Sequence, residues 1–138
     1  MVRRLVVAMI LATTSVPLMA QPCLACSCTP PPRNQEEREQ RADQADAVFT
    51  GKVWNIEGTD NSSYSTVSAR FFVEDAYKGT RRRRVTVTTP NQGAACGYYF
   101  EEGKRYTVFG YGEGPKRFST NSCSETQRGR INPDRYGL

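Results

Sequence analysis

The clearest hydrophobic pattern in the chain is a period of two that begins at Ala47. From there Phe49 and Val53 alternate with polar or exposed-type positions such as Thr50 and Lys52. A period of two is typical of a strand, because successive side chains point to opposite faces of a sheet. Similar patterns bounded by Gly, Pro, Asn and Asp recur later. The expected strands are 47–57, 64–77, 84–89, 105–111 and 117–121.

A short polar helix is expected before the strands, over residues 34–45. Asn34 can cap it, and Glu37 follows at the capping-box spacing. Ala42 and Ala45 are the small residues that could face inward, while the rest of the segment is charged. The helix should therefore lie on the surface of the fold.

Five closely connected strands with one short N-terminal helix predict a mainly β domain. We expect a small five-stranded, OB-fold-like closed barrel, with a β-sandwich as the alternative. This domain should span residues 26–126. The polar segment 127–138 is expected to be a loosely held C-terminal tail.

Residues 1–25 are typical of a secretory signal peptide, with two arginines near the start and an apolar run over residues 5–12. Small residues favour cleavage after Ala25, and a cut after Ala20 is the alternative. A third possibility is a lipoprotein with an acylated cysteine. Cleavage after Ala25 places the protein outside the cytoplasm, secreted to the extracellular space or the periplasm, with no membrane attachment.

The cysteine count also favours cleavage after Ala25. The chain has five cysteines, and this cut removes Cys23 and leaves Cys26, Cys28, Cys96 and Cys123. The first two are too close to bridge each other without strain, so each needs a distant partner or both bind a metal. An all-cysteine zinc site would normally use paired C-x-x-C spacings, and secretion favours oxidation. Two disulfides are therefore expected, with the pairing left open.

Composition makes several function classes improbable. The formal charge of +5 falls to +3 when Arg3 and Arg4 leave with the signal, which gives no reason to expect a nucleic-acid partner. The chain has no histidine, so histidine-based triads and zinc sites are excluded. The acidic pairs at 36–37 and 101–102 fall in expected surface segments. We therefore expect no enzyme activity and no cofactor.

Two further features have alternative interpretations. The run Arg81–Arg84 could bind an anion or nucleic acid, or could be a solvated strand edge that discourages edge pairing. The aromatic residues could be stacking platforms or the core and rim of the barrel. These residues are Tyr98, Tyr99, Phe100, Tyr106, Phe109 and Tyr111.

The order of several short motifs resembles the inhibitory domain of the tissue inhibitors of metalloproteinases, within the netrin-like group. The motifs are Cys26-Ser27-Cys28 with prolines, Ala45 to Phe49 with Gly51 to Val53, Phe72-Val73 with Tyr77 to Gly79, and Cys96-Gly97 with Phe100, Gly103, Tyr106 and Cys123. The animal inhibitors have a further disulfide and a C-terminal domain that this chain lacks. The short signal and short chain indicate a bacterial, single-domain member.

The resemblance implies a function and a site. It implies the disulfides Cys26–Cys96 and Cys28–Cys123. It also implies a protease-binding ridge made of Cys26, Ser27, Cys28, Thr29 and Pro30 together with Ala94, Ala95 and Cys96. In the family the free amine and carbonyl of the first cysteine, here Cys26, chelate the zinc of the protease, and Ser27 matches the residue that enters its specificity pocket.

The expected function is therefore secreted inhibition of zinc metalloendopeptidases by a monomer. The alternative is a non-inhibitory, netrin-like extracellular binding module. The two differ in one requirement, because only the inhibitor needs a free amine at Cys26.

Overall fold

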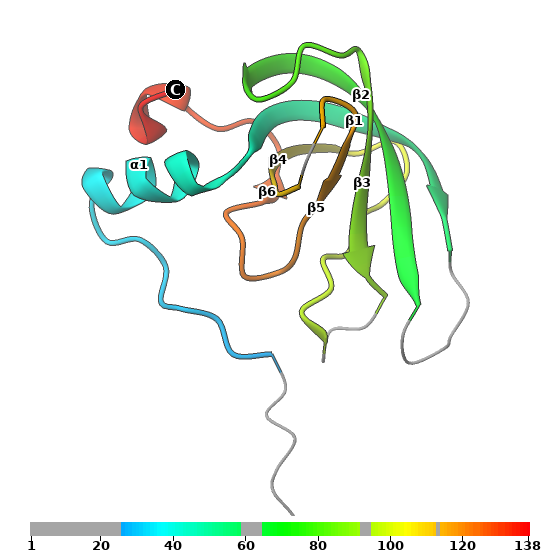
Figure 1. Ribbon diagram of the computed structural model, residues 1–138, viewed down its shortest axis with the longest axis horizontal. Helices are drawn as coiled ribbons and strands as arrows, with labels where there is room; N and C mark the ends of the chain where they lie inside the picture. Colours follow the sequence, from blue (N-terminus) through cyan, green and yellow to red (C-terminus); the bar gives the residue numbers. More distant parts are fainter. Residues whose placement is uncertain (1–25, 59–64, 92–94, 113) are drawn as a thin grey trace, which may run out of the picture.

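The structure is a computed structural model that describes residues 26–58, 65–91, 95–112 and 114–138. Within these residues, one helix and six strands are followed by a final 3-10 turn (Figure 1). Their order is α1 (Gln35–Gln44), β1 (Ala47–Glu57), β2 (Thr66–Lys78), β3 (Arg84–Pro90), β4 (Arg105–Gly110), β5 (Arg117–Ser119), β6 (Gln127–Arg128) and η2 (Pro133–Tyr136). The prediction of a mainly β fold with one short N-terminal helix is confirmed.

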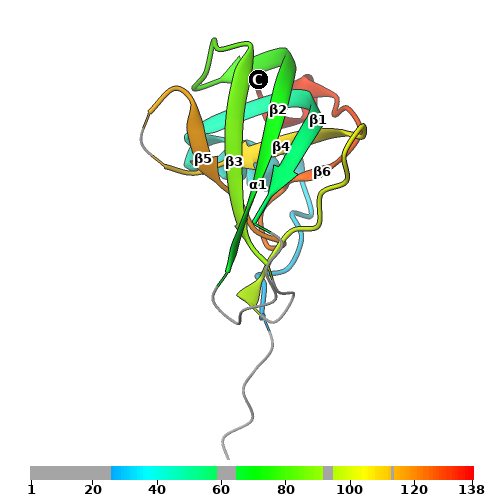
Figure 2. The same cartoon turned by 90° about the vertical axis from the view of Figure 1, so that its right-hand side faces the viewer.

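The strands form one sheet in the order β5-β3-β2-β1-β4-β6. All neighbouring pairs are antiparallel except β3 and β5, which are parallel. The β1–β2 ladder has register shifts at three places, and such irregularities bend and twist a strand pair. The sheet therefore curves strongly, as the two perpendicular views show (Figures 1 and 2).

The prediction of a closed five-stranded barrel is wrong, because the sheet is open and has six strands. The three residues of β5 form their ladder on β3. Among the described residues they reach the other side of the sheet through one bridge, where Tyr111 and Ser119 exchange two backbone hydrogen bonds of 2.7 and 2.8 Å. The opposite edge is occupied by β6, which pairs with β4. The short β5 and the extra strand together explain the difference.

The inner face of the sheet encloses the main hydrophobic core. Five strands contribute to it, with Phe49 from β1, Phe71 from β2, Val87 from β3, Val108 from β4 and Phe118 from β5 all buried. Aromatic rings meet edge to face within it, and the Phe49 and Phe71 centroids lie 5.7 Å apart. The alternation of Phe49 and Val53 in the sequence therefore matches the buried inner face of β1.

A second hydrophobic cluster lies on the outer face of β1 and β4. Ala42 of α1 packs there with Val48, Phe109 and Tyr136. This cluster explains why β1 is buried on both faces from Ala47 to Gly51, where the sequence predicted a simple alternation. The expectation of a loosely held segment after residue 126 is wrong, because β6 pairs with β4 and Tyr136 packs beneath α1.

The predicted capping of the helix is confirmed. Asn34 is the N-cap, and its side-chain oxygen accepts a 2.8 Å hydrogen bond from the Glu37 amide. The Glu37 carboxylate in turn accepts a 2.7 Å bond from the backbone N–H of Arg33, one residue before the cap. These contacts fix the point at which the N-terminal segment enters the helix.

An ion-pair cluster on the surface joins β2, β4 and the segment after β6. Glu74 accepts hydrogen bonds from the guanidinium groups of Arg105 and Arg130, and Arg130 also pairs with Asp75. The hydrogen bond from Arg105 is the main cause of the lowered pKa of Glu74, which burial opposes. The cluster connects the C-terminal segment to the middle of the sheet.

Candidate functional site

Two disulfides attach the N-terminal segment to the body of the domain. The bonded pairs are Cys26–Cys96 and Cys28–Cys123, with Cα–Cα distances of 5.1 and 5.0 Å. These are the pairs that the family resemblance implies. They close loops with sequence separations of 70 and 95 residues. In the chain-entropy model each closure contributes up to about 4–5 kcal/mol of stability.

The disulfides bring together the two parts of the expected ridge. The first part is exposed at Ser27, Cys28, Thr29 and Pro30. In the second part Ala95 is exposed and Cys96, the next residue in the sequence, is half-buried. Cys26 is also half-buried. Ala94, the remaining ridge residue, lies outside the described residues. Hereafter "the ridge" means residues 26–30 with 95 and 96.

The two disulfides lie against each other. The Sγ atom of Cys26 is 3.3 Å from that of Cys123 in the other disulfide, and the Sγ atoms of Cys123 and Cys96 are 3.7 Å apart. The backbone of the C-terminal cysteine loop adds to this junction, because the Ser122 amide donates a 2.8 Å hydrogen bond to the Cys96 carbonyl. The ridge is therefore anchored at one compact point.

The same sulfur cluster bears on the zinc alternative raised by the sequence. Three sulfur atoms, those of Cys26, Cys96 and Cys123, lie within 4.8 Å of one another, close enough to share a metal ion. All three belong to disulfides in this structure, whereas zinc binds the thiolate form of cysteine. The cluster therefore acts as a covalent anchor.

Arg41 of α1 contacts the ridge, a role that the sequence analysis did not predict. Its guanidinium donates a hydrogen bond to the carbonyl of Pro30 and forms a 3.1 Å ion pair with Glu125. Glu125 follows Cys123 by two residues, so this arginine connects the helix, the ridge and the second cysteine loop. In the sequence Arg41 is one of several charges on a polar helix, which gave no signal of this role.

The segment after Cys96 is held in a specific conformation. Cys96 has a φ of 61°, in the left-handed region that costs a non-glycine residue about 1–2 kcal/mol. Two residues later, the amide of Tyr98 donates a 2.8 Å bond to the Thr89 hydroxyl. Burial raises the pKa of Tyr98 above the usual value of a phenol. These contacts and the disulfide keep the turn in place.

The predicted aromatic set divides in the structure. Phe100, Tyr106 and Phe109 are buried and belong to the two cores, as the core-and-rim interpretation expects. Tyr99 differs, because 82% of its surface is exposed. It lies three residues after Cys96 and exposes an aromatic ring near the ridge in sequence. The sequence alone could not distinguish this exposed ring from the buried rings of the adjacent residues.

No helix in the described part of the chain has both the length and the apolarity needed to cross a membrane. The disulfides are consistent with an extracellular protein. The expected signal peptide, residues 1–25, lies outside the described residues.

No protein-family model matches the chain. The chain is similar to an NTR domain-containing protein of Margaritifera margaritifera, with 32% identity over 90 residues. The match covers 63% of this chain and 58% of the relative, so the chain spans little more than half of that protein's length. The bacterial source and the link to metalloproteinase inhibitors stay predictions. The similarity, together with the mainly β fold and the two disulfides, supports a netrin-like domain.

Proposed function

We propose that the chain is a secreted inhibitor of zinc metalloendopeptidases, and that the ridge occupies the active-site cleft of the protease. One observation carries the proposal: two adjacent disulfides fix the segment from Cys26 to Pro30, exposed from Ser27 onward, to Cys96 and Cys123. The resemblance assigns the inhibitory contact to these residues. The protein partner is a zinc metalloendopeptidase, and the chain acts as a monomer.

The chemistry of a catalytic zinc explains how a peptide terminus could inhibit it. Such a zinc has three protein ligands and keeps a fourth position open for water or substrate. When cleavage leaves Cys26 as the first residue, its α-amine and its carbonyl oxygen can both bind the metal and displace that water. An α-amine has an ordinary pKa of about 8, so it loses its proton readily on binding.

The support around the ridge would make this binding efficient. A flexible terminus loses conformational freedom on binding, at a cost of about 0.5–1.5 kcal/mol for each side chain that becomes fixed. Here the disulfides flank Ser27, and Arg41 holds the carbonyl of Pro30. The ridge therefore loses most of its conformational freedom during folding, before it meets the protease.

The direct test combines the mature N-terminus with an inhibition assay. Exported protein is expected to begin at Cys26 in N-terminal sequencing and to inhibit at least one member of a panel of zinc metalloendopeptidases. Protein with both disulfides reduced and alkylated is the control and should not inhibit. A mature protein that begins at Cys26 and inhibits no member of the panel would favour the alternative, a non-inhibitory netrin-like binding module.

Replacing the arginines at the start of the basic run should change inhibition little. Arg81, Arg82 and Arg83 lie in the β2–β3 connection, which is at the end of the molecule opposite the beginning of the blue segment before α1 in both views (Figures 1 and 2). The triple change to serine is therefore expected to change the inhibition constant by no more than about threefold. At the distance between this connection and the ridge, salt screens most of the effect of the lost charges. A loss of two orders of magnitude would place this connection in the protease contact.

A further inference from the structure

The four cysteines after residue 25 form one cluster of sulfur atoms, which the inhibitor proposal uses only as an anchor. Between the two disulfides, the Sγ atom of Cys26 lies 3.3 Å from that of Cys123 and 3.9 Å from that of Cys28, and the Sγ atoms of Cys96 and Cys123 are 3.7 Å apart. Among the described residues, three of these sulfur atoms form the one group of three or more metal-ligating atoms that lie within 4.8 Å of one another. The fold therefore gathers soft ligands from three distant parts of the chain.

The spacing of these sulfur atoms is close to that of a tetrahedral zinc site. Zinc in structural sites takes four ligands and binds cysteine sulfur at about 2.3 Å, which places the sulfur atoms about 3.8 Å apart. The non-bonded distances of 3.3, 3.7 and 3.9 Å lie around this value. When both disulfides are open, each bonded pair has to separate by only about 2 Å to reach the same spacing, and side-chain rotation can supply this change.

The same geometry does not favour exchange between the two disulfides. A thiolate attacks a disulfide in line with the S–S bond, so the far sulfur is more distant than the near one by a bond length, about 2 Å. The sulfur of Cys123 instead lies almost equally far from those of Cys26 and Cys96, at 3.3 and 3.7 Å. This position beside the bond suits ligands grouped around one ion better than a nucleophile that attacks one sulfur.

Contacts that do not involve the disulfides also hold the cysteine-bearing segments together. The amide of Ser122, in the C-terminal cysteine loop, donates a 2.8 Å hydrogen bond to the Cys96 carbonyl. Arg41 donates a hydrogen bond to the carbonyl of Pro30, two residues after Cys28. These hydrogen bonds do not require the S–S bonds, so the fold can keep the four thiols close together when the disulfides are reduced.

A hollow of about 340 Å³ gives access to the sulfur cluster. Its lining includes Cys28, Pro31, Ser122 and Cys123. Cys28 is exposed and the other three cysteines are half-buried. The Ser122 hydroxyl lies 3.8 Å from the Sγ atom of Cys26 and can donate a hydrogen bond to a thiolate there. Metal ligands in proteins are normally supported by such outer contacts.

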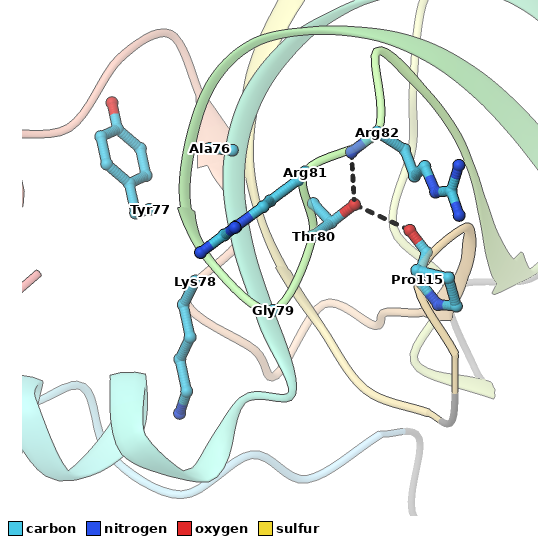
Figure 3. A pocket seen from close by; sticks show the side chains of 8 residues that line it. All are labelled: Ala76, Tyr77, Lys78, Gly79, Thr80, Arg81, Arg82 and Pro115. Atoms are coloured by element: carbon cyan, nitrogen blue, oxygen red, sulfur yellow. Dashed lines mark hydrogen bonds between the residues drawn. The ribbon is translucent and has the colours of Figure 1, made fainter.

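The arginine run beside the β2–β3 connection does not form a comparable site. A hollow of about 780 Å³ there is lined by Arg81, Arg82 and Pro115, among others. The Thr80 hydroxyl donates a 2.7 Å bond to the Pro115 carbonyl and accepts one from the Arg82 amide, and the Arg81 and Arg82 side chains point to opposite sides (Figure 3). Arg84 follows in β3, which lies inside the sheet between β2 and β5, so the expectation of a protected strand edge does not fit it.

We propose that the reduced chain binds one zinc ion through the thiolates of Cys26, Cys28, Cys96 and Cys123. Cysteines are thiols when a chain is made and become disulfides only in an oxidising compartment, so this state precedes the one described above. Each thiol loses its proton to solvent when it binds the metal. Each bridge then forms when a disulfide oxidant accepts two electrons from two thiolates and two protons from solvent, becomes a dithiol and leaves the zinc ion free. The proposal does not depend on protease inhibition.

The test uses protein that begins at residue 26 and is reduced with a phosphine. Its affinity for Zn²⁺ is measured by competition with a chromophoric chelator, in buffer and in concentrated urea. Co²⁺ serves as a spectroscopic probe, because cobalt thiolates give a charge-transfer band. Two matched variants, Cys28→Ser/Cys123→Ser and Cys26→Ser/Cys96→Ser, each remove one bridged pair. Melting curves of the reduced protein with and without zinc report whether the ion binds the folded domain.

We expect the reduced parent to bind one zinc ion, to give the cobalt charge-transfer band and to melt at a higher temperature with zinc than without it. The oxidised parent should give no such band. Each double variant should bind zinc at least about a hundredfold more weakly, because two of four ligands are lost. Zinc affinity equal to that of the parent in either variant would overturn a site shared between the two pairs. Equal affinity in buffer and in urea would show that the fold does not assemble the site and would overturn it as well.

Discussion

Adding one alanine before Cys26 is expected to abolish inhibition of a zinc metalloendopeptidase while leaving the fold unchanged. The extra residue moves the free amine about 3.8 Å along the chain. At Cys26 it leaves an amide nitrogen, whose lone pair is delocalised into the carbonyl and coordinates zinc poorly. The added residue also occupies the space through which the protease zinc must approach. We expect affinity to fall at least a hundredfold, or about 2.8 kcal/mol of binding free energy.

The experiment compares inhibition constants and melting temperatures of proteins that begin at Cys26 and at the added alanine. Both disulfides remain in the extended form, so its melting temperature should match that of the parent. Removal of the alanine with an aminopeptidase regenerates the Cys26 amine and should restore inhibition. Equal inhibition by the extended and parent proteins would rule out zinc chelation by Cys26.

Replacing Gly79 with alanine is expected to lower the free energy of unfolding by more than the same change at Gly103. Gly79 follows β2 with a φ of 74°, and a Cβ atom built on it would lie 1.8 Å from the carbonyl oxygen of Asp46. The left-handed conformation alone costs a residue with a side chain about 1–2 kcal/mol. The clash is with backbone at the start of β1, and relieving it adds about 1–3 kcal/mol.

Gly103 provides the matched control for this substitution. It has nearly the same φ, 78°, but a Cβ atom built there meets nothing within 4 Å. Gly103→Ala should therefore cost only the conformational part, about 1–2 kcal/mol. Denaturant unfolding of both variants measures the difference. If the two variants lose the same stability, the close approach of Gly79 to Asp46 does not occur in the folded protein.

The amino-acid sequence by itself determined the helix α1 and the strands β1 to β5. Alternation of apolar and polar residues located five strands within a few residues, because one face of each strand is buried against the same core. The Asn34 cap and the Glu37 spacing located the helix, since capping depends only on neighbours in the chain. The cysteine count indicated two disulfides, while their pairing came from the family resemblance.

Only the tertiary structure decided the features that depend on residues distant in the sequence. The strand β6 has only two residues, which is too short to show a hydrophobic period in the sequence. It pairs with β4 because the chain after Cys123 turns back along the sheet. The burial of Val48 on the outer face of β1 requires α1 and Tyr136 to cover it. Arg41 likewise looks like an ordinary surface charge in the sequence. Its role arises because the position of the helix brings it beside the ridge and Glu125, and no local pattern encodes that proximity.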